Sequence, residues 1–181
     1  RIIEIKMVTQ IADIENAHTM CVLVDNEPGV LARVIGLFAG RGYNIESLTV
    51  AEVNIVDNLS RINIVTSGTP MVIEQIKAQL ERLVPVHRVS DLTVEGPHVK
   101  REVALVKVHS SGEKRVESLR IADIFRARTV DSTNVSFVFE IVGDTGKLDA
   151  FINLMVPLGL IDVSRTGVAA IARGVTALEH E

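Results

Sequence analysis

The sequence predicts an α+β fold of two consecutive ferredoxin-like domains, each with the element order β-α-β-β-α-β. Three observations predict this fold. Short aliphatic segments typical of strands alternate with longer segments whose apolar residues recur at helical spacing. The same succession begins at Met20 and again about 82 residues later, at Glu102. With 181 residues, 47% of them hydrophobic, the chain is long enough for two small domains.

The composition argues against several classes of function. Only 3% of the residues are aromatic and none is Trp, whereas modules that stack on bases need exposed rings. The formal net charge is −4, whereas a general nucleic-acid or acidic-membrane binder usually has a basic surplus. One cysteine allows no intrachain disulfide. We therefore expect a cytoplasmic protein with no nucleic-acid partner and no membrane partner.

The elements of the first domain begin after residues 1–16, which have no clean period and are predicted to form an N-terminal extension. Met20 to Asp25 is predicted to form a strand, and the following loop has the residues of a helix start. The helix is indicated by apolar residues at helical spacing, namely Val30, Leu31, Val34, Ile35, Leu37 and Phe38. Gly42 is predicted to end it in the left-handed conformation.

The rest of the first domain repeats these signals. Residues 44–54 and 59–66 are predicted strands, joined by a turn at Asp57-Asn58. Thr69 is the predicted N-cap of a second helix, with Pro70 at its first position. One apolar stripe marks that helix, formed by Ile73, Ile76, Leu80 and Leu83. Residues 85–94 are the fourth predicted strand.

The second domain follows a break at residues 95–98. Its predicted strands are 102–109, 128–132, 135–142 and 161–165, and the tail 168–172 is predicted to extend the last one. A helix is predicted over 113–127, with Val116, Leu119, Ala122 and Phe125 on one face. Another helix is predicted to begin at Asp144, and its inward-facing residues are Leu148, Phe151, Ile152 and Met155. The expected organisation is an extension (1–16), a first domain (17–95), a linker (96–101), a second domain (102–176) and a tail (177–181).

The open face of each sheet is predicted to need a cover, because two helices shield only one face. The strands are too apolar to face water, as shown by Ile62 and Ile64 in the first domain and by Val103, Leu105 and Val106 in the second, so we expect a partner subunit to cover them. The strand 44–54 has only Glu46 and Glu52 as charges. It would be a poorly defended edge in a monomer and is therefore a predicted dimer seam.

The loop between Asp25 and Leu31 is the main candidate binding site. Unpaired amides at the start of the following helix suit a carboxylate or a phosphate, and Gly29 lets a ligand approach the backbone closely. An amide side chain next to branched apolar groups occurs twice, and the candidate residues are Asn26, Gly29, Val30, Leu31, Asn44 and Ile45. Together they would suit a small apolar α-amino acid. The alternative interpretation is a capped helix after a turn.

Other candidate sites are weak. The histidines His87, His98 and His109 lie eleven residues apart, which matches no metal motif, so no metal site is expected. The segment 143–148 resembles a phosphate-binding loop only superficially, because Leu148 replaces the Ser or Thr that binds magnesium. Cys21 is predicted to be a small core residue. Gly36 and Gly40 indicate either a close helix–helix approach or chance, and no catalytic set of residues is visible.

Three segments carry a resemblance to a known family. DNEPGVLARVIGLFAGRGYNIESLTV (25–50), GKLDAF (146–151) and SRTGVAAIARG (164–174) resemble the regulatory small subunit of acetolactate synthase, also called acetohydroxyacid synthase. Many ACT domains share the N-x-P-G-x-L core, whereas RVIGLF followed by RGYNIESLTV is particular to this family. The resemblance covers about residues 18–176.

The resemblance implies an N-terminal ACT domain that pairs with a second copy and a C-terminal ferredoxin-like domain. It also implies an effector, usually valine and sometimes leucine or isoleucine, bound between Asn26, Gly29, Val30 and Leu31 of one subunit and Asn44 and Ile45 of the other. The chain would be a non-catalytic subunit that activates the catalytic subunit and confers feedback inhibition. No cofactor is expected in this chain, whereas the catalytic partner is expected to hold thiamine diphosphate, magnesium and FAD.

Two other classes of function are alternatives. One is a stand-alone ACT-type module that senses an amino acid and regulates another protein or transcription, although no helix-turn-helix or basic patch supports a role in transcription. The other is a catalytic or RNA-binding ferredoxin-like domain. RNA binding needs aromatic residues on the central strands, and residues 20–25 and 59–66 contain none.

Overall fold

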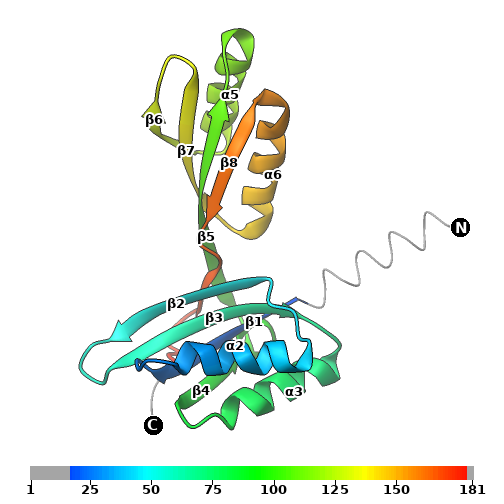
Figure 1. The fold of residues 1–181 in the computed structure, drawn as a ribbon, viewed down its shortest axis with the longest axis vertical. Coiled ribbons are helices and arrows are strands. Elements are labelled where there is room, and N and C mark those ends of the chain that lie inside the picture. The colour runs from blue at the N-terminus through cyan, green and yellow to red at the C-terminus, as the bar shows by residue number, and fades with distance from the viewer. Residues whose placement is uncertain (1–16, 179–181) are drawn as a thin grey trace, which may run out of the picture. The chain divides into compact units, whose positions relative to one another are not determined.

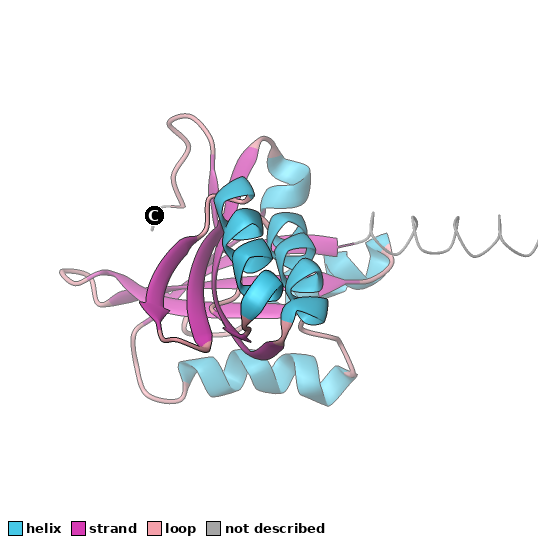
Figure 2. Cartoon of the chain, turned by 90° about the horizontal axis from the view of Figure 1, so that it is seen from above, coloured by secondary structure: helices cyan, strands magenta, loops and turns pink. Residues whose placement is uncertain are grey.

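The computed structural model describes residues 17–178, which divide into two units. Among the described residues, the first unit contains 17–99 and 170–178, and the second contains 100–169. In each unit an antiparallel sheet has helices on one face (Figures 1 and 2), which confirms the predicted fold class. The predicted extension over 1–16 lies outside the described residues.

The first unit contains the predicted β-α-β-β-α-β succession and one additional helical turn. Its elements are β1 (Ala17–Asp25), α2 (Val30–Arg41), β2 (Ser47–Asn54), β3 (Leu59–Ser67), α3 (Pro70–Glu81), β4 (Val86–Asp91) and α4 (Leu92–Glu95). The strand order is β2-β3-β1-β4, so β2 and β4 are the edges. Both ends of β3 therefore lie beside the edge strand β2 and the central strand β1.

The ends of the two long helices follow the predicted chemistry. Gly42 ends α2 with a φ of 70°, and the N–H of Tyr43 donates to the carbonyl of Phe38 at 3.0 Å. The Thr69 hydroxyl accepts from the amide of Val72 at 3.4 Å, and Pro70 occupies the first turn of α3. These predicted caps are confirmed.

The core of the first unit lies between the sheet and its two helices. It consists of aliphatic residues and Phe38, namely Met20, Val22, Val24, Val30, Val34, Phe38, Ile62, Ile64, Ile73, Ile76, Leu80 and Val89. Ile62 and Ile64 therefore face the helices, and it was wrong to expect them on the open face. Because side chains alternate along a strand, the open face instead presents Cys21, Arg61 and Asn63.

Several predicted boundaries of the first unit are corrected by the structure. The fourth strand stops at Asp91, short of residue 94, because the Asp91 carboxylate accepts from the amide of Thr93 at 3.0 Å and begins α4. The strand predicted over 44–54 begins at Ser47. Residues 98–101, predicted to be a linker, already belong to a strand that starts at His98.

The second unit contains the repeated succession. The elements after α4 are β5 (His98–His109), α5 (Gly112–Ile124), β6 (Arg128–Ser132), β7 (Ser136–Gly143), α6 (Thr145–Met155), η1 (Val156–Leu158), β8 (Leu160–Arg165) and β9 (Ala169–Ala172). The strand order is β6-β7-β5-β8, and β9 pairs with β5. Helix α6 buries Leu148, Phe151 and Met155 as predicted. The Asp144 carboxylate accepts from the amide of Lys147 at 2.8 Å and caps that helix.

Helix α5 differs from its prediction. It ends at Ile124, and its buried residues are Ser118, Ile121 and Ala122, whereas Val116 is 68% exposed. The Ser118 hydroxyl donates to the carbonyl of Lys114 at 2.7 Å, which satisfies this buried polar group within the helix. Ser118 can therefore occupy an inward position that an apolar pattern does not reveal.

The strand pairing at the end of the chain also differs from its prediction. Residues 168–172 do not extend β8, because the chain turns at Gly167, which has a φ of 86°, and β9 then pairs with β5. From Ala170 onward the described chain belongs to the first unit, whereas the predicted second domain ran to residue 176. The amide of Arg173 donates to the carbonyl of Pro97 at 2.9 Å and fixes this placement.

Within the second unit, we expect Glu102→Gln to lower the free energy of unfolding by about 2 kcal/mol. Glu102 is 5% exposed and accepts from Arg165 Nε and Nη2, both at 2.8 Å. This hydrogen bonding, supported by Asp149, raises the pKa of Arg165. Loss of the carboxylate charge would leave a half-buried guanidinium poorly compensated. Chemical denaturation measures the change. Glu117→Gln in the exposed Glu117–Arg120 pair is the control, and an equal effect there would contradict the prediction.

Candidate functional site

The predicted binding loop forms the start of α2. Gly29 precedes the helix with φ 86° and ψ −10°, a left-handed conformation that favours glycine, and no side chain caps the helix. The amide of Arg33 makes the first helical hydrogen bond, to the carbonyl of Gly29 at 3.1 Å. Within the described residues, the amides of Leu31 and Ala32 donate to no protein acceptor. This end of α2 therefore offers free N–H groups and the positive end of a helix dipole to an anion.

Neighbouring segments hold this loop on both sides. The amide of Asn26 donates to the carbonyl of Asn58 at 2.7 Å, and Asn58 Nδ2 donates to the carbonyl of Asn26 at 3.3 Å. The amide of Asp25 donates to the carbonyl of Pro85 at 2.9 Å, and the Asp25 carboxylate lies 2.6 Å from His87 Nε2. The loop is therefore fixed by the turn between β2 and β3 and by the start of β4.

The structure separates the roles of the two apolar residues in this loop. Val30 is 6% exposed and packs in the core, so its side chain supports the helix. Leu31 is 37% exposed, and Ile35 on the next turn is 36% exposed. These two side chains form an apolar surface beside the free amides, on the same helix.

Asn44 and Ile45 lie at the other end of β3. The hydroxyl of Thr66 donates to the carbonyl of Asn44 at 2.5 Å, whereas Asn26 is bonded to Asn58, just before β3 begins at Leu59. From Leu59 to Thr66 a strand advances roughly 23 Å. Within one chain, therefore, Asn44 and Ile45 do not meet the loop that contains Asn26 and Gly29.

The remaining sequence candidates are explained by local structure. His98 Nδ1 lies 3.1 Å from the carbonyl of Gly96, and His87 contacts Asp25. Between residues 17 and 178 no cluster of three His, Cys, Asp or Glu side chains is placed to hold a metal ion. Leu148 is fully buried, so segment 143–148 begins a helix and its last residue belongs to the core.

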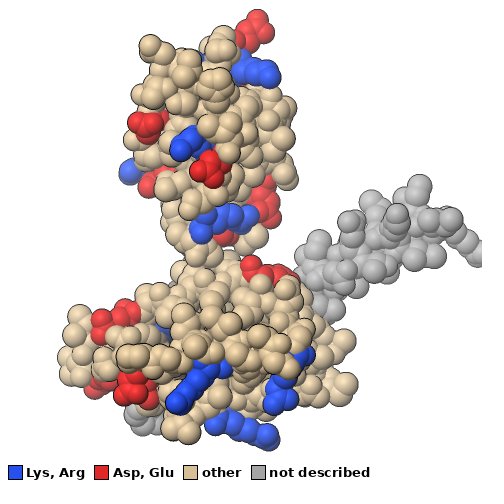
Figure 3. All heavy atoms as spheres, viewed as in Figure 1, with Lys and Arg blue, Asp and Glu red and all other residues tan. Residues whose placement is uncertain are grey.

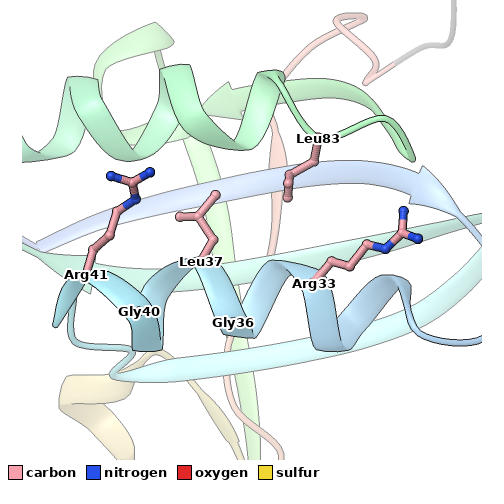
Figure 4. A pocket seen from close by; sticks show the side chains of 6 residues that line it. All are labelled: Arg33, Gly36, Leu37, Gly40, Arg41 and Leu83. Carbon is pink, nitrogen blue, oxygen red and sulfur yellow. The ribbon is translucent and has the colours of Figure 1, made fainter.

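Gly36 and Gly40 line a groove between α2 and α3. A Cβ added at either glycine would meet nothing within 4 Å, so no close helix approach occurs at them within the described chain. The groove has a volume of 560 Å³, and its other lining residues are Arg33, Leu37, Arg41 and Leu83 (Figure 4). Since it contains none of the predicted site residues, it is distinct from the loop at the start of α2.

The described residues carry both signs of charge at the surface. On the face drawn in Figure 3, Lys and Arg lie among Asp and Glu on the second unit, whereas on the first unit most of the acidic side chains gather at one end and the basic ones lie mainly along the lower part. No helix in the described range 17–178 is both long and apolar enough to span a membrane.

The sequence predicts the loop before α2 as a candidate site, but it does not predict the residues that hold this loop in place. Asn58 adopts a positive φ of 54°, which Asn tolerates better than most residues, so the turn signal at 57–58 was visible while its contact with Asn26 was not. From the sequence, His87 is a candidate only for a metal ligand. Its position opposite Asp25 depends on the pairing of β1 with β4.

The chain matches two family models and is similar to proteins from several organisms. Residues 20–88 match a family model described as AHAS small subunit-like ACT domain, and residues 101–174 match one described as small subunit of acetolactate synthase. A probable acetolactate synthase small subunit from Archaeoglobus fulgidus is 48% identical over 87% of this chain and 97% of its own length. The acetolactate synthase isozyme 3 small subunit of Escherichia coli is 47% identical over 86% of this chain and 94% of its own.

A solved structure gives the same relationship for the whole fold. The crystal structure of an acetolactate synthase small subunit from Thermotoga maritima is 37% identical in sequence and superimposes with a TM-score of 0.80. It covers 88% of this chain and 99% of its own.

Proposed function

Because the chain belongs to the family of acetolactate synthase small subunits, we propose that it activates the catalytic subunit of that enzyme and confers feedback inhibition by valine. The observation that carries the proposal is the start of α2, where free amides, Gly29 and an exposed apolar side chain lie together in the ACT domain. This combination matches the carboxylate and the aliphatic side chain of a branched amino acid. Leucine or isoleucine would use the same chemistry.

The proposed site holds valine through three kinds of contact. The amides of Leu31 and Ala32 would bind the carboxylate, where the helix dipole favours negative charge. The side-chain amides of Asn26 and of a second copy's Asn44 would supply oxygens for the ammonium group. Leu31, with Ile45 of the second copy, would contact the isopropyl group. Gly29 leaves room above the backbone, since nothing lies within 4 Å of a Cβ built there.

The second copy is part of the proposal because one chain separates the two halves of the site. Edge strand β2 exposes Val50 by 43% and Val53 by 54%, which favours pairing with another strand. If two copies of β2 pair antiparallel, the start of one lies beside the end of the other. Since the end of β2 pairs with Leu59, beside the turn that holds Asn26, the copy's Asn44 would arrive at that loop.

The carbon–carbon chemistry belongs to the catalytic subunit in this proposal. That subunit is expected to hold thiamine diphosphate, magnesium and FAD, while this chain acts by binding it. The cytoplasm is the proposed location, and the single thiol of Cys21 is consistent with a reducing compartment. Valine would inhibit by binding best to the arrangement of the ACT dimer that activates least.

Reconstitution with an acetolactate synthase catalytic subunit tests the proposal. Acetolactate formation is measured with the catalytic subunit alone, with this chain, and with this chain plus valine. We expect this chain to raise the activity and valine to lower it again. No activation would overturn the proposal. Valine binding by calorimetry without any effect on acetolactate formation would instead favour a stand-alone amino-acid sensor.

Asn44→Ala is expected to weaken valine binding about 10-fold, because it removes a polar partner from a ligand that loses its water on binding. Isothermal titration calorimetry of valine into the purified chain measures the affinity. Asn134→Ala is the matched control, since Asn134 is an exposed residue in a loop of the second unit. Unchanged affinity in Asn44→Ala, or an equal loss in the control, would remove Asn44 from the site.

A further inference from the structure

A row of polar contacts crosses the open face of the first sheet. Asn63 Nδ2 on β3 donates to the hydroxyl of Thr49 on β2 at 2.9 Å. Asn63 Oδ1 accepts from Cys21 Sγ on β1 at 3.1 Å and from Arg61 Nε at 3.3 Å. Arg61 Nη2 then donates to the carbonyl of Ala170 at 2.7 Å. These contacts connect the edge strand β2 with the segment at the end of the described chain.

We call residues 170–178 the C-terminal strap, because they return from the second unit onto the first. The strap covers the middle of the open face: Ala170 is 7% exposed, and Cys21 beneath it is fully buried, with Sγ 3.8 Å from the Ala170 carbonyl. Most of the strap beyond Ala170 packs little, since Ile171 is 58% exposed and Val175 fully exposed. Few apolar contacts therefore hold it. The pairing of β9 with β5 and the hydrogen bond from the Arg173 amide to the Pro97 carbonyl hold its backbone, while the bond from Arg61 attaches it to the open face of the sheet.

Arg61 is suited to a contact that can break. It has no carboxylate partner in the described part of the chain, and its guanidinium donates to three uncharged acceptors, Asn63, Cys21 and the Ala170 carbonyl. The side chain is only half-buried. If the strap lifted, water would replace the carbonyl at little electrostatic cost.

Strand β3 connects the strap with both halves of the proposed effector site. The turn before its first residue bonds to Asn26, its Thr66 hydroxyl bonds to the carbonyl of Asn44, and Arg61 lies between these ends. A small displacement of β3 on effector binding would reach Arg61 through the backbone of a single strand. Hydrogen bonds from two neighbouring side chains of β3, Arg61 and Asn63, connect the strap to β1 and β2.

We propose that the C-terminal strap is a detachable element held on the first sheet by Arg61, and that this contact transmits the effector's presence to the second unit. The chain passes directly from the second unit into the strap. Attachment or release of the strap would therefore change how tightly the last residues of the second unit are held. Arg61 is a positioning residue in this proposal and touches no ligand. The transmission step rests on the proposed function, whereas the detachable strap does not.

Hydrogen–deuterium exchange on the full chain tests the strap. Arg61→Met removes the donors and keeps much of the side-chain volume. We expect amides of residues 170–175 to exchange at least 10-fold faster in this variant, while amides of β1 and β3 keep their rates. Arg88→Met is the matched control: Arg88 and Arg61 both lie opposite Leu23, on the two neighbouring strands of the same face. Unchanged exchange in Arg61→Met, or equal acceleration in the control, would overturn the proposal.

The single thiol gives a second readout. Burial raises the pKa of the Cys21 thiol, and the charge of Arg61 opposes this rise. Removing Arg61 therefore lowers the thiolate fraction, so a faster reaction of Cys21 with a thiol reagent can only report access. We expect a faster reaction in Arg61→Met and no change in Arg88→Met. If Arg61→Met does not fold, exchange of the wild-type chain in low denaturant decides: strap amides that exchange only together with β3 amides would contradict a detachable strap.

The transmission step is tested in the reconstituted enzyme. We expect Arg61→Met to bind valine with an affinity within about twofold of wild type and to lose most of the valine inhibition. Arg61→Lys, which keeps the charge and one donor, should restore part of it. Full inhibition in Arg61→Met would overturn transmission through this contact. If the wild-type chain shows no valine response, the proposed function fails, while the exchange and thiol measurements still decide the strap.

Discussion

Gly29→Asp is expected to abolish valine inhibition while leaving activation of the catalytic subunit intact. The new carboxylate would stand at the start of α2, where the proposed site receives the ligand carboxylate, and two like charges brought together cost several kcal/mol. We expect valine binding to weaken by about 100-fold. Calorimetry measures the binding, and acetolactate formation with increasing valine measures the inhibition.

The folded structure should tolerate this variant. Gly29 has a φ of 86°, and Asp is among the residues that adopt the left-handed region at modest cost. A carboxylate at the start of a helix also interacts favourably with the helix dipole. Gly29→Asn is the matched control, because it has nearly the same shape and backbone tolerance without the charge. Equal loss of valine response in both variants would assign the effect to backbone strain, and full sensitivity in Gly29→Asp would place the site elsewhere.

A mixture of two defective chains is expected to regain valine sensitivity. In the proposed dimer each site takes Gly29 from one copy and Asn44 from the other. A dimer of one Gly29→Asp chain and one Asn44→Ala chain therefore has one site with both changes and one with neither. Either variant alone should bind valine more weakly than the wild-type chain at every site. After mixed refolding, we expect a fraction of the sites to bind valine with wild-type affinity.

The control for the mixture is a pair that cannot complement. Gly29→Asp mixed with Leu31→Asp places both changes in the same half of the site, so every site keeps a defect. Calorimetry counts the high-affinity sites in both mixtures. Recovery in neither mixture would show that Gly29 and Asn44 of different chains do not share a site, and recovery in both would show that subunit exchange is not the cause.

Much of the fold was predictable because its strongest signals are local. Gly42 and Thr69 mark helix ends through backbone geometry and side-chain capping, which depend on neighbours in the sequence. Ser118 shows where local reasoning stops: its hydroxyl bonds within its own helix, so a polar residue takes an inward position that the pattern assigned to apolar ones. The return of the chain at Ala170 could not be predicted, since the contact with Arg61 joins residues 109 positions apart.

The candidate site likewise has local features that the sequence predicts and long-range contacts that it does not predict. The chemistry at the start of α2 follows from a Gly, an Asn and the free amides of a helix, all within a few residues. The supports of the loop come from Asn58 and His87, which only the sheet brings near. The separation of Asn44 from Asn26 is a matter of strand length, and no motif reveals it.

The two halves of the proposed site lie at opposite ends of β3, so a ligand can contact both halves only when two chains have associated. Ligand binding is therefore coupled to dimer formation by mass action. A ligand held between two chains binds the dimer and not the separated chains, so its apparent affinity falls as the protein is diluted below the dissociation constant of the dimer. By the same linkage, valine bound at the proposed site would raise the association constant of the subunits. The sensitivity of the enzyme to its end product would then depend on how much small subunit the cell contains.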